Sequence, residues 1–435
     1  MRLVLNIRRR NQYEWVIAFI LFVPFLFGLM IDGLGTSSLI KYSLDVAWLF
    51  LLCGLFLNRI RLSTPELEKL LNMVFIFFGV TLIGFVLGEK SPFYYMWGFR
   101  NNFRFFIYFF ACSVFLRRDD AEGYLNALDL LFYLNFIVVL FQFFVQGWSG
   151  DYLGGIFGIH KGSNAATIIF LLIVCARAIL NTFNYSESIW VCLIKCLFSI
   201  IVSIFAELKI FFVLLGLLVG LSSVYTKNST RKVIVIIFSV AALYIGAQLL
   251  AVIFPSWENW FSIEYMMEHV SSTNGYTDSG DLNRLTGVHI IWGNFLITWP
   301  ERLFGLGLGN CDTSAFSFLN TSFFQRYAYL HYNWFSIAFM FLETGILGLG
   351  FYVGFFVVLY VCINRRLKDD PEAKVYCQLA KVLTVVSMIL IVYNQSMRIE
   401  AAYMIYFVLA LPFIQQKQPE TESVNHEYSI KEAKP

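Results

Sequence analysis

Charge is scarce in this 435-residue chain. Charged residues make up 14% of it and hydrophobic residues 58%, whereas about a quarter of a soluble domain is charged. This excludes an ordinary water-soluble globular protein. The eight cysteines show neither a disulfide framework nor metal-site spacing, although Cys311 alone falls in a long polar stretch. We interpret them as small buried apolar residues and predict no metal and no cofactor.

The segments without charge are long apolar runs. Runs near 20 residues recur, long enough to cross a ~30 Å hydrocarbon core as helices, whereas barrel strands would be shorter and alternating. We predict an all-α polytopic membrane protein with about twelve transmembrane helices. The predicted spans are 15–31, 39–57, 70–88, 103–116, 124–145, 164–181, 189–206, 210–225, 232–254, 334–362, 375–393 and 400–414.

Two irregular places are visible among these spans. The tenth is overlong and contains Glu343 and a glycine series, which indicates a kink or a partly buried start. The turn before span eight, at Lys209, is tight. A basic run, Arg8–Arg10, precedes the first span without a small-residue cleavage site after it, so we interpret that span as a retained helix rather than a signal peptide.

The spans divide the chain into four parts. Residues 1–254 would hold nine helices, 255–333 one large polar loop with short helices, 334–414 the last three helices, and 415–435 a disordered tail. Basic residues favour cytoplasmic loops. With the first end inside, the rule is satisfied at Arg8–Arg10, Arg59, Arg61, Lys69, Arg117, Arg118, Lys227, Arg231, Lys232, Arg365, Arg366 and Lys368. Both termini would then be cytoplasmic and the long loop external.

Several cations oppose that rule on the outer side. Snorkelling at the interface explains Lys41 and Lys90, and it competes with a ligand-binding role for the others. Arginine binds phosphate oxygens bidentately, so cations at the membrane surface suit a lipid diphosphate. The strongest candidate is Arg284, which opens an amphipathic stretch ending at Trp292. The remaining outward cations are Arg100, Arg104, Lys161, Lys209, Arg302, Arg326 and Arg398.

One histidine stands at the water boundary. His331 lies where the long loop meets span ten, and an imidazole can take a proton from a hydroxyl near neutral pH. The alternative is an interfacial histidine bonded to backbone. His160 and His289 are weaker candidates. His269, with Glu264 and Glu268 at helical spacing, more simply forms a solvated helix face than a metal site.

Two other motifs have simpler explanations. Gly305, Gly307 and Gly309 lack the ending of a nucleotide loop and predict a close backbone turn instead. The carboxylates could form a glycosidase pair, but their Ser/Thr/Gly/Asp-rich setting favours a solvated loop. They are Asp278, Asp281 and Glu301.

Taken together, one ordered set of motifs resembles a known family. The run Arg284…Trp292…Pro300…Gly305-x-Gly307-x-Gly309…His331-x-Asn333…Leu342-Glu343-x-Gly345-x-x-Gly348 resembles the signature region of the O-antigen ligase and Wzy-type polymerase superfamily. Weaker echoes lie at Gly158…Asn164-Ala165-Ala166, Arg100-Asn101-Asn102-Phe103-Arg104 and Asn394…Arg398.

The resemblance implies a fold and a chemistry. Members are metal-independent inverting glycosyltransferases with a GT-C-like membrane fold, acting on the periplasmic face of the bacterial inner membrane upon undecaprenyl-diphosphate-linked glycans. His331 matches the family's base and Arg284 one diphosphate-binding arginine. Lys209 stands near the place of the second arginine, without its forked head. Arg100, Arg104, Arg398 and Arg302 would be further diphosphate contacts, and Asn333, Glu343, Gly305 and Gly307 supporting motif residues.

Three functions follow, in order of preference. The first is an O-antigen or exopolysaccharide polymerase that joins lipid-linked donor and acceptor repeat units in the bilayer, with a chain-length regulator as a further partner and no nucleic acid. The second is an O-antigen ligase that transfers the glycan to lipid A–core. The third is a lipid-linked oligosaccharide flippase, although the repeated halves typical of transporters are not visible.

Overall fold

A computed structural model describes residues 12–57, 64–88, 91–253, 275–277, 280–314 and 316–414. Within these ranges the chain is helical, with no strand and a single isolated bridge between Tyr276 and Leu282. The predicted all-helical class is confirmed. Some predicted features lie outside the described residues, namely the tail 415–435, the loop start 255–274, Arg8–Arg10, Arg59, Arg61, Lys90, Asp278, and His269 with its two glutamates.

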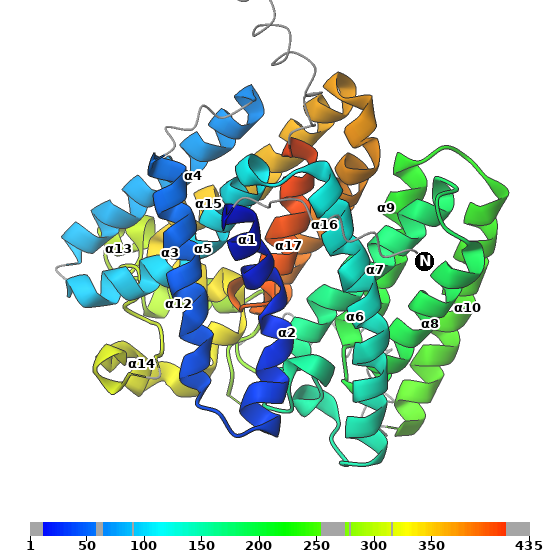
Figure 1. The fold of residues 1–435 in the computed structure, drawn as a ribbon. Coiled ribbons are helices and arrows are strands. Elements are labelled where there is room, and N and C mark those ends of the chain that lie inside the picture. Colours follow the sequence, from blue (N-terminus) through cyan, green and yellow to red (C-terminus); the bar gives the residue numbers. More distant parts are fainter. Residues whose placement is uncertain are drawn as a thin grey trace, which may run out of the picture.

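Figure 1 shows the helices in chain order. The first half contains α1 (Gln12–Phe22), α2 (Pro24–Phe27), the π-helix η1 (Gly28–Gly33), η2 (Ser38–Tyr42), α3 (Ser43–Leu57), α4 (Pro65–Leu87), α5 (Pro92–Phe115), α6 (Arg118–Phe144), α7 (Asn164–Phe183), α8 (Ile189–Phe205), α9 (Lys209–Tyr225) and α10 (Thr230–Ile253). The second contains α12 (Gly287–Asn294), α13 (Trp299–Phe304), α14 (Ser322–Tyr327), α15 (Ser336–Asp369), α16 (Lys374–Tyr393) and α17 (Ala402–Ala410).

Six helices among the described residues are long and apolar enough to cross a membrane. They are Ser38–Leu57, Pro65–Leu87, Arg118–Phe144, Asn164–Phe183, Ser336–Asp369 and Pro371–Tyr393. The pair Gln12–Phe22 and Pro24–Gly33, bent by 44°, gives a seventh if it is one span. Ile189–Phe205, Lys209–Tyr225 and Ala402–Phe413 are apolar but shorter. The described chain is therefore a helical membrane protein with six or seven helices of spanning length, and twelve crossings stay a prediction.

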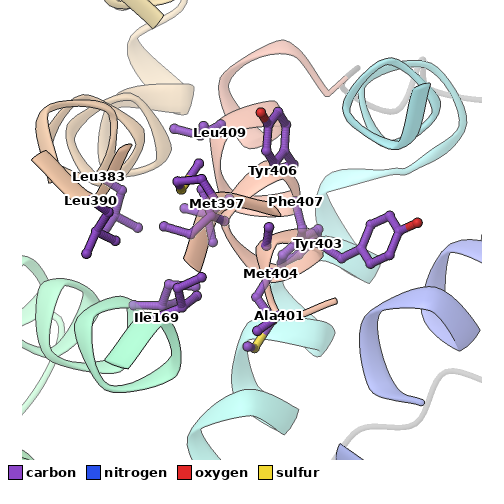
Figure 2. Close-up of a cluster of buried hydrophobic side chains, with 14 of the residues drawn as sticks. Ile169, Leu383, Leu390, Met397, Ala401, Tyr403, Met404, Tyr406, Phe407 and Leu409 are labelled. Atoms are coloured by element: carbon purple, nitrogen blue, oxygen red, sulfur yellow. The ribbon is translucent and has the colours of Figure 1, made fainter. Parts of the chain in front are cut away.

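The centre of the bundle is made by α7 and α17. The apolar window of α7 is 89% buried, and every residue of α17 is buried. Figure 2 shows side chains of α17 beside Ile169 of α7 and Leu383 and Leu390 of α16. By contrast, the windows of α3, α4 and α6 are 28% buried, so their apolar faces meet lipid. The ends of α7 and α17 are therefore firmly placed by the packing of the surrounding helices.

The overlong helix α15 breaks near its start. Gly345 has φ 65° and ψ −169°, which confirms the predicted kink. The glycine run packs into this break, because the N–H groups of Leu306 and Gly307 donate to the carbonyls of Leu342 and Glu343 (2.9 and 3.1 Å). A Cβ on Gly305 would lie 2.3 Å from the Glu343 carbonyl carbon, so only glycine permits the approach. The loop that carries His331 is thus fastened to α15.

Candidate functional site

Two segments of the long loop meet at their backbones. The N–H of Leu282 donates to the carbonyl of Leu330 at 3.0 Å. The residue before Leu282 therefore faces the residue after Leu330, and His331 Nδ1 lies 2.5 Å from Asp281 Oδ1. A ring N–H at Nδ1 that donates to this carboxylate leaves Nε2 as a proton acceptor. The pair has the arrangement of a general base held by an acid.

The backbone of His331 is held in an unusual conformation. Its φ is 50°, and among the other described non-glycine residues only Tyr185 and Glu207 share a positive φ. The left-handed region costs on the order of 1 kcal/mol for a side chain with a Cβ. Such strain persists where the surroundings impose it, and it gathers at functional sites. The imidazole stacks on Trp334, with ring centroids 3.9 Å apart, which fixes its plane.

Trp334 lines a cavity of about 320 Å³ together with Arg284 and Phe335. The Arg284 guanidinium lies over the rings of Phe335 (5.2 Å) and Tyr393 (4.8 Å), and its Nε donates to the Tyr393 carbonyl at 3.3 Å. No carboxylate within the described chain forms an ion pair with it. Arg284 therefore lines the cavity directly, whereas the His331–Asp281 pair adjoins it through Trp334, which lines the cavity and stacks on the imidazole.

The tight turn between α8 and α9 supplies a second cation. Glu207 takes the left-handed conformation there (φ 52°), and Glu207, Leu208 and Ile210 line the same cavity. Lys209, the first residue of α9, lies ahead of the predicted apolar span. The pKa of its ammonium is lowered to about 8, mainly by burial. The charge of Glu207 acts to raise this pKa, and the charge of Arg284 acts to lower it further. The two cations thus influence each other across the cavity.

The remaining lining mixes apolar residues with polar side chains that can form hydrogen bonds. Asp151, Asn164 and Gln395 line the cavity with Lys161. Asn164 Nδ2 donates to Asp151 Oδ1 (2.9 Å) and to the Ala206 carbonyl (3.1 Å). Burial raises the pKa of Glu207, an effect that Lys209 opposes. Cations and hydrogen-bonding oxygens therefore share one pocket.

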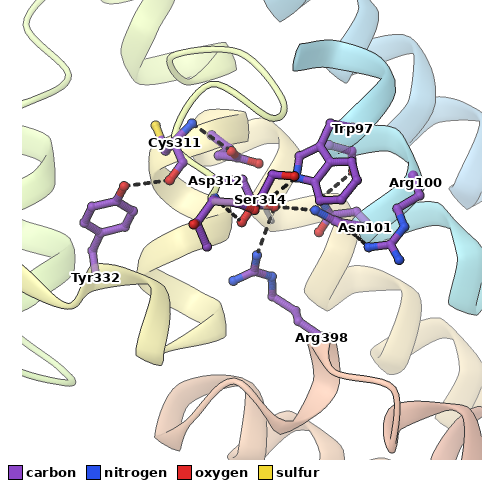
Figure 3. A network of polar contacts seen from close by, with 12 residues as sticks. Trp97, Arg100, Asn101, Cys311, Asp312, Ser314, Tyr332 and Arg398 are labelled. Atoms are coloured by element: carbon purple, nitrogen blue, oxygen red, sulfur yellow. Dashed lines mark hydrogen bonds and ion pairs between the residues drawn. The ribbon is translucent and has the colours of Figure 1, made fainter. Parts of the chain in front are cut away.

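Three of the predicted diphosphate ligands contact acidic residues elsewhere, and Figure 3 shows two of them, Arg100 and Arg398, in one network of polar contacts. Arg100 contacts both carboxylate oxygens of Asp45 (2.8 and 2.9 Å). Arg104, almost fully buried, faces Glu400 at 3.6 Å. Arg398 lies 3.9 Å from Asp312, which also accepts a 2.5 Å hydrogen bond from Asn101. None of these three arginines is among the described residues that line the cavity. Each has an acidic partner that is remote in sequence.

The other predicted residues hold the loop. Arg302 donates to the Leu296 carbonyl (3.0 Å) and its guanidinium lies over the Trp292 and Trp299 rings. The buried carboxylate of Glu343 accepts from the Cys311 N–H at 3.0 Å. Asn333, half-buried, belongs to the 3₁₀ turn Tyr332–Trp334 beside the site. Glu301, read from the sequence as a loop carboxylate, forms a capping box with Thr298 at the start of α13.

Sequence reasoning missed the role of Asp281. Its polar neighbours favoured a solvated loop, yet the carboxylate contacts His331 and its side chain is 20% exposed. Two signals pointed weakly to the site. Trp334 directly follows the His331-x-Asn333 motif, and Lys161 was noted as an outward cation. Neither identified a partner for the imidazole.

No family model matches the chain, and no curated protein is similar to it.

Proposed function

We propose that the chain is a membrane polymerase for O-antigen or exopolysaccharide, joining repeat units carried on undecaprenyl diphosphate. The observation that carries this proposal is the His331–Asp281 pair, which stacks on Trp334 at the wall of a cavity that Arg284 also lines, with Lys209 close enough to Arg284 for their charges to interact. The motif resemblance in the sequence supports the same chemistry. We refine the fold to twelve crossings, with the short helices α8, α9 and α17 counted among them.

The course of α15 supports a proposed orientation of the site. This helix starts at Ser336 beside the cavity and carries Arg365, Arg366 and Lys368 near its other end. Its 34 residues correspond to about 50 Å of helix, somewhat less with the kink, so the site and the basic end lie on opposite membrane faces. Basic ends favour the cytoplasm. We therefore place the site on the periplasmic face of the inner membrane and both termini in the cytoplasm.

The proposed reaction uses each group once. A sugar hydroxyl of the acceptor gives its proton to His331 Nε2 as its oxygen bonds to the anomeric carbon of the donor. The bond from that carbon to the diphosphate oxygen breaks, and the electron pair leaves with the diphosphate. Arg284 and Lys209 stabilise this charge. Asp281 keeps the imidazole oriented and stabilises the imidazolium. Attack opposite the leaving group inverts the anomeric configuration.

Reconstitution of the purified protein tests the function directly. In vesicles with one lipid-linked repeat unit as both donor and acceptor, we expect a ladder of longer lipid-linked glycans, resolved by gel electrophoresis. Growth only after lipid A–core is added would identify a ligase instead. Movement of the unit across the vesicle membrane without lengthening would identify a flippase. Either result would replace the polymerase assignment.

The pKa of Lys209 predicts a dependence on pH. The ammonium carries its charge below about pH 8 and loses it above, so donor affinity should weaken as the pH rises through that value. Lys209→Arg keeps a full charge and should flatten this dependence. The measurement is the donor KM on both sides of about pH 8 for both proteins. An equal rise of KM in Lys209→Arg would show that another group causes it.

A further inference from the structure

A smaller cavity adjoins the catalytic cavity. It measures about 150 Å³ and shares Lys161, Gly162 and Gln395 with its larger neighbour. Lys41 and His160 line it as well. It has room for about five water molecules, enough for a phosphate-bearing group but not for a sugar chain. The polymerase reaction described above makes no use of it.

The charge of this side cavity is mainly positive. Within the described chain, Lys41 and Lys161 form no ion pair or hydrogen bond, and Lys161 Nζ lies only over the Trp334 ring, at 5.3 Å. Glu400 is the one carboxylate among the described lining residues, and it faces Arg104 at 3.6 Å. Glu400 also interacts electrostatically with Lys41, so this one carboxylate serves two cations, and the two lysines outnumber it among the described lining residues.

His160 is placed to respond to an anion. Its Nδ1 lies 3.7 Å from Asp32 Oδ2, and its side chain is 48% exposed. Burial lowers its pKa and the Lys41 charge lowers it further, while Asp32 opposes both. A phosphate bound beside Lys41 would offset the positive charge that lowers the pKa of His160, and it would therefore favour the imidazolium. The imidazole would then become a further donor to the bound group.

The loop that carries His160 and Lys161 is held in place by contacts with Asp32. The Ile159 N–H donates to Asp32 Oδ2 at 2.7 Å. Gly158 has φ 117°, and a Cβ there would lie 2.3 Å from the same oxygen. The loop is thereby fixed to η1, and the cations need little reordering when a ligand binds, which favours affinity.

The geometry points to a second anion site. We propose that the side cavity binds the phosphate-bearing lipid headgroup of the acceptor, while Arg284 and Lys209 hold that of the donor. This inference rests on the proposed function, since a polymerase takes two substrates with the same headgroup. Lys161 borders both cavities, and its contact Trp334 stacks on His331. The base would thus stand between the two anions, where an acceptor hydroxyl must meet the donor.

Binding stoichiometry tests this without turnover. The probe is farnesyl diphosphate, titrated by calorimetry against the full chain in lipid nanodiscs. We expect two equivalents for the wild type and one for the double variant Lys41→Gln/His160→Gln, whose second site should weaken about tenfold or more. Arg284→Gln/Lys209→Gln should also bind one. Arg326→Gln, which removes an exposed charge from α14, is the control and should bind two.

Three results would overturn the proposal. One is a Lys41→Gln/His160→Gln protein that still binds two equivalents and unfolds at the wild-type temperature. The second is a wild type with a single site that Arg284→Gln/Lys209→Gln removes. The third is displacement of the probe from the side cavity by farnesol as effectively as by pyrophosphate. The cavity would then bind the lipid tail and not the headgroup. Equal affinity for pyrophosphate and probe there would keep the anion site but reject the lipid acceptor.

Failure of the proposed function is visible separately. A reconstituted protein that makes no ladder but binds two equivalents would contradict the polymerase and leave the second anion site standing. A protein that makes ladders with unchanged acceptor KM in Lys41→Gln/His160→Gln would contradict only the inference.

Discussion

Replacing His331 with alanine should abolish glycan chain growth while the protein stays folded. Loss of a general base typically lowers a rate by about 10²–10⁴-fold, which would empty the ladder under ordinary assay times. The imidazole is 37% exposed, so its removal leaves no buried cavity. The measurements are the glycan ladder in reconstituted vesicles and the unfolding temperature of the same sample.

The left-handed backbone of His331 calls for a second variant. Alanine is strained at φ 50°, and a lost ladder could then reflect a displaced loop. Asparagine tolerates this conformation but offers no comparable base, so His331→Asn should lose the ladder and keep the fold more fully. His289→Ala, at an exposed position on α12, should grow chains normally. Wild-type ladders from both His331 variants would remove this residue from the chemistry.

Much of this architecture can be predicted from the sequence, because the length of an apolar run is a local property of the chain. The apolar runs predicted the helices, and the glycine series near Glu343 predicted the break of α15, which Gly345 makes. The close turn at Gly305 was likewise predicted, since several glycines in a short run favour unusual backbone angles. What the pattern did not contain was the partner of that turn, the α15 backbone at Leu342 and Glu343.

Contacts between remote segments could not be predicted from one chain. Arg100 pairs with Asp45, 55 residues away, and Arg104 with Glu400 on the far side of the sequence. A search for acidic residues near each arginine in the sequence finds neither Asp45 nor Glu400, because the packing of the helices determines which side chains are in contact. The role of Asp281 was missed for the same reason, because its contact with His331 depends on the pairing of Leu282 with Leu330.

The last apolar segment combines apolarity with full burial inside the bundle, and its crossing of the membrane stays a prediction. The run 400–414 predicts a span, but its helix covers Ala402–Phe413 with its 3₁₀ end and is shorter than a membrane crossing usually requires. It is buried on all sides. Its apolarity therefore reflects a central position among α5, α7 and α16 rather than contact with lipid. Local hydropathy cannot separate these two causes.

Arg284→Gln should lower turnover by about 10²–10³-fold, the usual effect of removing one preorganised group that stabilises a developing negative charge. Arg284 forms no ion pair within the described residues, and its guanidinium is held over Phe335 and Tyr393, so its charge is available to the leaving diphosphate. Arg284→Lys keeps the charge but loses the planar fork of the guanidinium. Its turnover should lie between those of the wild type and Arg284→Gln. The measurement is the rate of lipid diphosphate release from a fixed donor concentration.

The control separates a local effect from a general loss of surface charge. Arg326→Gln also removes one arginine from the loop, at an exposed site where the guanidinium lies over the Tyr327 ring, and it should release diphosphate at the wild-type rate. Raising the salt concentration should change the Arg284 effect little, because a charge inside a cavity is screened less than one on the surface. If Arg284→Gln and Arg326→Gln slowed the reaction equally, the cavity arginine would be acting through the overall field, and the leaving group would have to be held elsewhere.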